Sequence, residues 1–229
     1  MEDETVNKNG MKLQGLLWLN NVNVSDAVPF DVPPKILHGE DFYNEIIKSK
    51  KFKVNQSAFL QINTVVSEQL FDLISRLSQT DNETVLLDIC SGIGTIGIVC
   101  GEHAKQVIGI EMVESACKDA EHNVKENNME GKYSVVFGKV EQHIDNLVKT
   151  RLSGNEGKII WVVDPPRQGL HPKVISSLRR CKGLNRLIYV SCNPKVLVSN
   201  LRELVLPETS KRKAPPFVPV AAYGVDLFP

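Results

Sequence analysis

Residues 84–97 read TVLLDICSGIGTIG, and this stretch decides the fold. A continuous apolar run at 84–89 predicts a buried strand, and a glycine-rich turn then leads into a helix expected at about 95–103. The same order of strand, loop and helix repeats downstream. Further strands are expected at 106–110, 133–137, 159–163 and 186–190, with helices at 113–127, 140–152, 172–181 and 194–204. This alternation predicts a doubly wound α/β sheet, in which ligands bind at the carboxyl ends of the strands.

The chain outside these repeats is less regular. Residues 1–10 predict a disordered start, residues 11–60 a partial β-rich appendage, and residues 61–229 the main domain. A helix is expected at 64–77 and a sixth strand at 217–225. The run KFKVN at 51–55 predicts a strand with a basic face. The lysines of that face fit a solvated sheet edge better than an RNA contact, and they are Lys48, Lys50, Lys51 and Lys53.

Composition and charge exclude several classes of protein. Hydrophobic residues make up 42% of the 229, and Lys plus Arg balance Asp plus Glu at 27 each, which argues against strong non-specific nucleic-acid binding through bulk charge. The odd number of cysteines, five, with no CxxC pair and no His-rich cluster, predicts neither a disulfide framework nor a metal site. The polar start is unlike a targeting peptide, and no apolar run is long enough to span a membrane. We therefore expect a cytoplasmic or nuclear protein without a membrane partner.

The glycine-rich turn predicts a nucleotide site. Gly92, Gly94 and Gly97 form G-x-G-x-x-G between a strand and a helix, where a ligand can approach the backbone and helix N–H groups are free. Glu111 ends the next strand, where a carboxylate can accept both hydroxyls of a ribose. The same pattern also fits NAD. Asp88, four residues before Gly92, favours S-adenosylmethionine, because methyltransferases commonly keep an acid at that point.

Two further motifs follow later strands. Asp164-Pro165-Pro166-Arg167 is a rigid loop that can present Asp164 to a flat ring, and Arg167 suits a carbonyl, carboxylate or phosphate. Cys192 in SCNP lies just before an expected helix N-terminus, where the local field favours a thiolate nucleophile. The other cysteines are interpreted as packing residues, and they are Cys90, Cys100, Cys117 and Cys181.

A thiolate suits methylation of uracil C5, which is by itself a poor nucleophile. Attack at C6 makes the ring enolate-like and C5 nucleophilic; a base then removes the C5 proton and the cysteine is eliminated. Arg167 or backbone donors can stabilise charge on the ring oxygen. A base in folded RNA must first be extruded to reach such a pocket.

Together, FLQIN, DICSGIGTIG, DPPRQGL, YVSCNP and DLFP resemble the RNA 5-methyluridine methyltransferase family, in particular its eukaryotic tRNA members, over about residues 35–229. The resemblance implies a Rossmann-like class I S-adenosyl-L-methionine methyltransferase sheet and uridine in the T-loop of tRNA as the target. It implies Cys192 as nucleophile and Glu111 as the ribose-binding acid. Asp164 would lie at the boundary of cofactor and uracil, and Gln61 would contact cofactor or base. Cys90 and Thr95 would complete the cofactor contacts.

Two departures from the family pattern bear on activity. The family's general-base glutamate follows a few residues after DLFP, and its last antiparallel strand lies there too, whereas this sequence ends at Pro229. The family's N-terminal RNA-binding module is also missing from the sequence. We therefore expect a monomeric catalytic fragment that binds S-adenosylmethionine and has weak activity or none.

Three alternatives remain open at this stage. A NAD-dependent oxidoreductase is supported by the G-x-G-x-x-G and Glu111. An amino-group methyltransferase would use the Pro-Pro loop without a covalent step. A non-catalytic cofactor-binding module would show no thiol-dependent RNA adduct.

Overall fold

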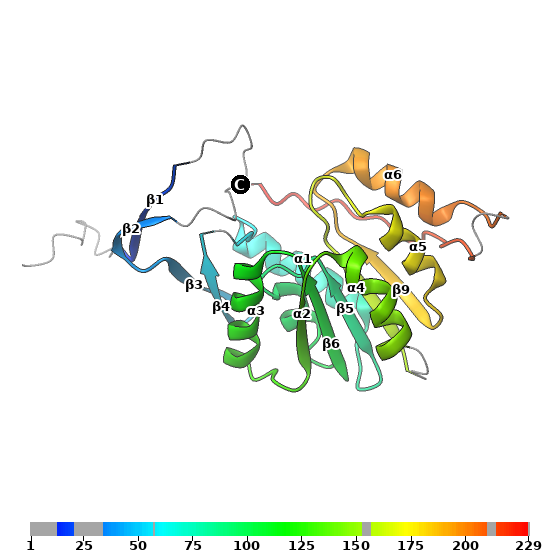
Figure 1. Ribbon diagram of the computed structural model, residues 1–229, viewed down its shortest axis with the longest axis horizontal. Helices are drawn as coiled ribbons and strands as arrows, with labels where there is room; N and C mark the ends of the chain where they lie inside the picture. Colours follow the sequence, from blue (N-terminus) through cyan, green and yellow to red (C-terminus); the bar gives the residue numbers. More distant parts are fainter. Residues whose placement is uncertain (1–12, 21–33, 57, 153–156, 210–213, 229) are drawn as a thin grey trace, which may run out of the picture.

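The computed structural model describes residues 13–20, 34–56, 58–152, 157–209 and 214–228. Its centre is a parallel sheet of five strands in the order β7-β6-β5-β8-β9 (Figure 1). The strands are β5 (Val85–Ile89), β6 (Gln106–Glu111), β7 (Tyr133–Phe137), β8 (Ile159–Val163) and β9 (Leu184–Tyr189). The strand order reverses beside β5, because the chain moves outward through β6 and β7 and then returns to β8. The doubly wound α/β fold predicted from the sequence is therefore confirmed.

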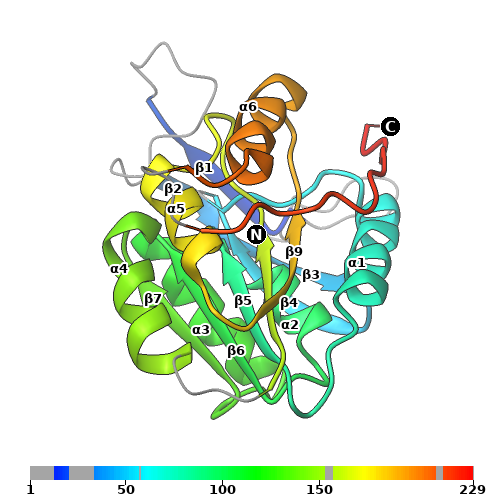
Figure 2. The same cartoon turned by 90° about the vertical axis from the view of Figure 1, so that its right-hand side faces the viewer.

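Helices cover both faces of this sheet. They are α1 (Thr64–Ser78), α2 (Thr95–Cys100), α3 (Glu114–Glu126), α4 (Val140–Leu147), α5 (Pro172–Arg180) and α6 (Pro194–Val205). Side chains of α1, α2 and α3 enter one buried cluster, and those of α4, α5 and α6 enter a second. Figure 2 shows α4 and α5 on one side of the sheet and α1 on the other. Burial on both faces explains why β8 is apolar along its whole length and why β5 is apolar except at Asp88.

The N-terminal part forms two antiparallel hairpins. Strand β1 (Gly15–Trp18) pairs with β2 (Lys35–Gly39), and β3 (Phe42–Ile47) pairs with β4 (Lys50–Asn55). The first hairpin lies at the end of the molecule opposite α5 and α6 (Figure 1). The second packs against α3, and its Ile47, Phe52 and Val54 belong to the buried cluster of α1, α2 and α3. The β3–β4 hairpin is therefore part of that core.

The lysines on the basic face of the β3–β4 hairpin form ion pairs with acidic side chains. Each of its lysines forms an ion pair with an acidic side chain outside the hairpin; the pairs are Lys48–Asp72, Lys50–Glu102, Lys51–Glu126 and Lys53–Asp119. The acidic partners lie on α1, on α3 and just after α2. These pairs link the hairpin to the helices of the main domain, and Lys48 and Lys51 remain exposed, as expected of a solvated edge.

Two predicted elements differ from the structure. The sixth strand expected at 217–225 is wrong, because this part of the segment 214–228 pairs with no strand among the described residues. Pro219 within the segment, and Pro215 and Pro216 directly before it, have no N–H group to donate to a ladder, which disfavours a strand here. The helix expected at 140–152 is α4 followed by a π-helical turn, η1 (Val148–Leu152).

The remaining bounds differ from the predicted ones by a few residues at most, the largest difference being the end of α2, where Gly101 follows Cys100. The predicted disorder of residues 1–10 lies outside the described residues. Within the described ranges, no helix is long and apolar enough to cross a bilayer.

Candidate functional site

The predicted motifs meet at the carboxyl edge of the sheet. Backbone hydrogen bonds extend the ladder one step beyond each strand end: Ser91 N–H donates to Ile110 O (3.1 Å), Asp164 N–H to Ile89 O (3.1 Å), and Val190 N–H to Val163 O (2.8 Å). Because β5, β6, β8 and β9 run parallel, these bonds place the loops that follow them along one line. The glycine-rich, DPPR and SCNP loops are thus neighbours.

Glu111 holds the first turn of the glycine loop. Its Oε2 accepts from Gly92 N–H (2.9 Å), and its Oε1 accepts from Met112 N–H (2.7 Å) and Val113 N–H (2.9 Å). Gly92 has a φ of +54°, which a residue with a Cβ rarely adopts, and no atom lies within 4 Å of the place where that Cβ would be. The backbone therefore turns tightly and leaves open space at Gly92 for a ligand.

Asp88 fixes the loop from inside the sheet. Its Oδ2 accepts from Gly97 N–H (2.8 Å) and from the hydroxyl of Tyr133 (3.1 Å). The Gly97 amide is therefore engaged by protein and is not free for a ligand. Among the described residues, the buried Oδ1 of Asp88 has no hydrogen-bond partner. Such an oxygen remains able to accept a hydrogen bond from a bound molecule or water.

Tyr133 is the site residue that sequence reasoning missed. A Cβ on Gly97 would lie 2.6 Å from its ring, and a Cβ on Gly109 would lie 2.6 Å from its hydroxyl. The third glycine of the motif is thus required for the Tyr133 side chain beneath the loop. No sequence signal pointed to it, since a tyrosine that opens a strand is typical of a core residue.

The carboxylates make this edge of the sheet acidic. Burial, together with the negative charges of Asp164 and Glu111, raises the pKa of Asp88 to about 7. Burial also raises the pKa of Asp164 to about 6. The site therefore disfavours additional negative charge, and a cationic ligand would relieve the repulsion among its acids.

The loop that carries Cys192 is tied to the DPPR loop. Asn193 caps α6 by accepting from Val196 N–H (3.4 Å), and its amide donates to the carbonyl of Arg167 (2.9 Å). Asn200 on α6 accepts from Leu170 N–H (2.8 Å) and from the Tyr189 hydroxyl (2.7 Å). These bonds fix the start of α6 relative to the end of β8. The Cys192 and Arg167 side chains are both exposed there.

The other cysteines are shielded. Cys100, Cys117 and Cys181 are buried, and burial raises the pKa of their thiols to about 12, 12 and 11. Cys90 is half-buried, and burial together with the charge of Glu111 raises the pKa of its thiol strongly. Cys192 is the only exposed cysteine of the five, all of which the structure describes.

The remaining predicted site residues have clear positions, but no contact among the described residues assigns them a role. Thr95 is buried as the first residue of α2, directly after Gly94. Gln61 lies half-buried, two residues before Asn63, whose side chain caps α1 by accepting from Val66 N–H (3.2 Å). The roles of Thr95, Gln61 and Arg167 stay predictions. In the described part of the chain, no cluster of His, Cys, Asp or Glu could hold a metal ion.

Comparison with solved structures places the fold among the S-adenosylmethionine-dependent methyltransferases. A putative enzyme of that class from Streptococcus mutans matches 76% of this chain with a TM-score of 0.53 at 13% identity, which shows the fold alone. A tRNA (uracil-54, C5)-methyltransferase from Pyrococcus abyssi, solved in complex with S-adenosyl-L-homocysteine, matches 85% of this chain and 45% of its own, with a TM-score of 0.64 and 26% identity.

Sequence comparison identifies the family. The tRNA (uracil-5-)-methyltransferase family model matches residues 3–215, and the chain belongs to that family. It is 38% identical over 200 residues to human tRNA (uracil-5-)-methyltransferase homolog A, covering 86% of this chain and 31% of the relative. An uncharacterized RNA methyltransferase of Clostridium tetani is 32% identical over 226 residues, covering 99% of this chain and 45% of the relative. The chain thus spans about a third to a half of the length of these relatives.

Exposure predicts a large difference in thiol reactivity. We expect iodoacetamide at pH 7.5 to alkylate Cys192 at least about tenfold faster than any other cysteine, because the buried thiols are protonated and shielded. Peptide mapping by mass spectrometry over a time course measures each rate. Faster labelling of Cys117 or Cys181 in the folded chain would contradict the placement of Cys192.

Asp88 predicts a pH-dependent stability. The pKa of Asp88 is about 7 in the folded chain and about 3.9 in the unfolded chain. Its contribution to the free energy of unfolding is therefore full below about pH 4 and is lost as the pH rises to about 7. Asp88→Asn imitates the protonated form at every pH. The unfolding free energy of the original chain relative to this variant should therefore fall from pH 4 to 7, by at most about 4 kcal/mol. Urea unfolding at several pH values measures it, and a constant difference would show that Asp88 titrates normally.

Proposed function

We propose that this chain carries the cofactor site and the nucleophile of an S-adenosylmethionine-dependent methyltransferase that acts on C5 of uridine in RNA, with tRNA as the substrate. The observation that carries this proposal is the position of Cys192. It is the one exposed cysteine of the chain, and it follows β9, the strand next to β8, which Asp164 follows. Family membership supports uridine and tRNA as the target.

The acidic edge fits S-adenosylmethionine better than NAD. The cofactor carries a sulfonium and an ammonium group, whereas the pyrophosphate of NAD is anionic. Asp88, Glu111 and Asp164 lie close enough for the charges of the last two to raise the pKa of Asp88, so a cationic group is favoured beside them. When bound, S-adenosylmethionine supplies an electrophilic methyl group. The open space at Gly92 and the free Oδ1 of Asp88 are the features of the described site that suit a ligand.

The contribution of Cys192 follows from its place before α6. Cys192 is exposed two residues before Pro194, the first residue of α6, so a substrate can reach its sulfur. We infer that the thiolate adds to C6 of uracil, which turns the ring into an enolate-like species with a nucleophilic C5. After methyl transfer, removal of the C5 proton by a base lets the sulfur leave. Arg167, exposed in the adjoining loop, is proposed to hold a uracil carbonyl or a phosphate.

Several broader expectations accompany this proposal. We propose that residues 61–229 form the methyltransferase domain and that residues 11–60 form an appendage whose β3–β4 hairpin shares the core of that domain. We also propose that the chain is a monomer in the cytoplasm or nucleus. Gln61, Thr95 and Cys90 are proposed to contact the cofactor. The NAD-dependent oxidoreductase is not favoured, because no relative reported above belongs to that class.

A covalent trap tests the reaction. Incubation with S-adenosylmethionine and tRNA containing 5-fluorouridine should link the nucleotide to Cys192, because fluorine at C5 cannot be removed as a proton. Mass spectrometry of the peptides locates the link. Cys192→Ala should abolish it, and Cys181→Ala, which alters a buried thiol, should retain it.

Calorimetry tests cofactor binding separately from the methylation reaction. S-adenosyl-L-homocysteine should bind the original chain and Cys192→Ala with the same Kd within about twofold, and NADH should not bind. An adduct that persists in Cys192→Ala, or preferential binding of NADH, would refute the proposed function.

A further inference from the structure

Helix α3 takes the place of a strand beside β4. Asp119, Asn123 and Asn127 follow one another at four-residue spacing, which is about 6 Å along a helix. They contact Asn55, Lys53 and Lys51, which are alternate residues of β4 and lie about 6.6 Å apart along a strand. The two spacings match, so the side chains of α3 satisfy backbone groups along the outer edge of β4.

The two asparagines bind this edge in the same way. Asn127 accepts from Lys51 N–H (3.0 Å) and donates to Lys51 O (2.7 Å). Asn123 accepts from Lys53 N–H (2.7 Å) and donates to Lys53 O (3.2 Å). Each amide thus bonds both the N–H and the C=O of one β4 residue, as a neighbouring strand would do.

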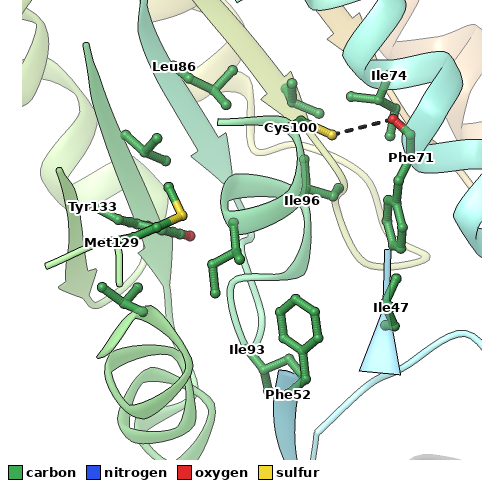
Figure 3. Close-up of a cluster of buried hydrophobic side chains, with 14 of the residues drawn as sticks. Ile47, Phe52, Phe71, Ile74, Leu86, Ile93, Ile96, Cys100, Met129 and Tyr133 are labelled. Atoms are coloured by element: carbon green, nitrogen blue, oxygen red, sulfur yellow. Dashed lines mark hydrogen bonds between the residues drawn. The ribbon is translucent and has the colours of Figure 1, made fainter. Parts of the chain in front are cut away.

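Only Asn123 also reaches the glycine loop. Its fully buried amide donates to the carbonyl of Ile93 (3.1 Å), which lies between Gly92 and Gly94. The Ile93 side chain belongs to the same buried cluster as Phe52 of β4, and the two are drawn next to each other in Figure 3. Ile93 is therefore held by Asn123 at its backbone and by the hairpin cluster at its side chain.

We propose that Asn123 is a positioning residue that couples the β3–β4 hairpin to the cofactor loop. This inference rests on the proposed function, which makes the glycine loop the cofactor site. One buried amide joins Lys53 of the hairpin to Ile93 of the loop, so a shift of either segment breaks bonds to the other. The hairpin thereby becomes part of the cofactor site through Asn123. Binding at the loop and order in the hairpin must then favour each other reciprocally.

Two matched substitutions test the coupling. Asn123→Asp and Asn127→Asp each keep the acceptor for a lysine N–H and place an oxygen against two carbonyls. One is the lysine carbonyl in both variants, and the other is Ile93 O for the first and Asn123 O for the second. At a temperature where both variants are folded by circular dichroism, Asn123→Asp should raise the Kd for S-adenosyl-L-homocysteine about five- to tenfold. Asn127→Asp should change this Kd by less than about twofold. Equal effects of the two variants on the Kd would overturn the proposal.

Hydrogen exchange tests it without any substitution. Saturation of the original chain with S-adenosyl-L-homocysteine should slow exchange of the Lys53 amide about fivefold more than that of the Lys51 amide, because only the former bonds to the bridging residue. Equal slowing of the two amides, or none, would contradict the coupling even if Asn123→Asp failed to fold. Failure of the original chain to bind the compound at all would refute the cofactor site itself, and the coupling with it.

Discussion

The carboxylate of Asp88 is fully buried, and the protein supplies hydrogen bonds to only one of its two oxygens, Oδ2. It takes them from the Gly97 amide and the Tyr133 hydroxyl, and these two bonds fix the path of the chain from β5 into α2. The bare Cα atoms of Gly97 and Gly109 are needed because the tyrosine ring lies against both. The glycine loop thus owes its shape to a buried polar network as well as to glycine flexibility.

The parallel sheet brings three acids and the exposed cysteine to the same edge. Asp88, Glu111 and Asp164 create a field that favours cations, at the ends of β5 and β6 and just after β8. Cys192 lies exposed after β9, two residues before the start of α6. Separate strand ends therefore keep these three acids and Cys192 apart. The Asn193–Arg167 and Asn200–Leu170 hydrogen bonds hold the start of α6 and the loop after β8 in fixed positions relative to each other.

The sequence predicted what depends on local pattern and missed what depends on distant contacts. The strands at 133–137 and 159–163 match the structure, because continuous apolar runs between loops identify buried strands. The strand at 217–225 was wrong, since Pro215 and Pro216 precede it and Pro219 interrupts it, and none of the three can donate to a ladder. Tyr133 and Asn123 escaped notice because their partners, Asp88 and Ile93, lie 45 and 30 positions away. The lysines of β3–β4 likewise depended on acidic partners that no local pattern reveals.

The central claim is that the glycine loop and Glu111 form the cofactor site, and amide NMR tests it most directly. Titration of the ¹⁵N-labelled chain with S-adenosyl-L-homocysteine should shift the amides of Gly92, Met112 and Val113 most, because all three donate to Glu111. Amides of α4 and α5, which cover the opposite face from α1, should stay in place. Saturable shifts that leave Gly92 and Met112 unmoved would contradict this account.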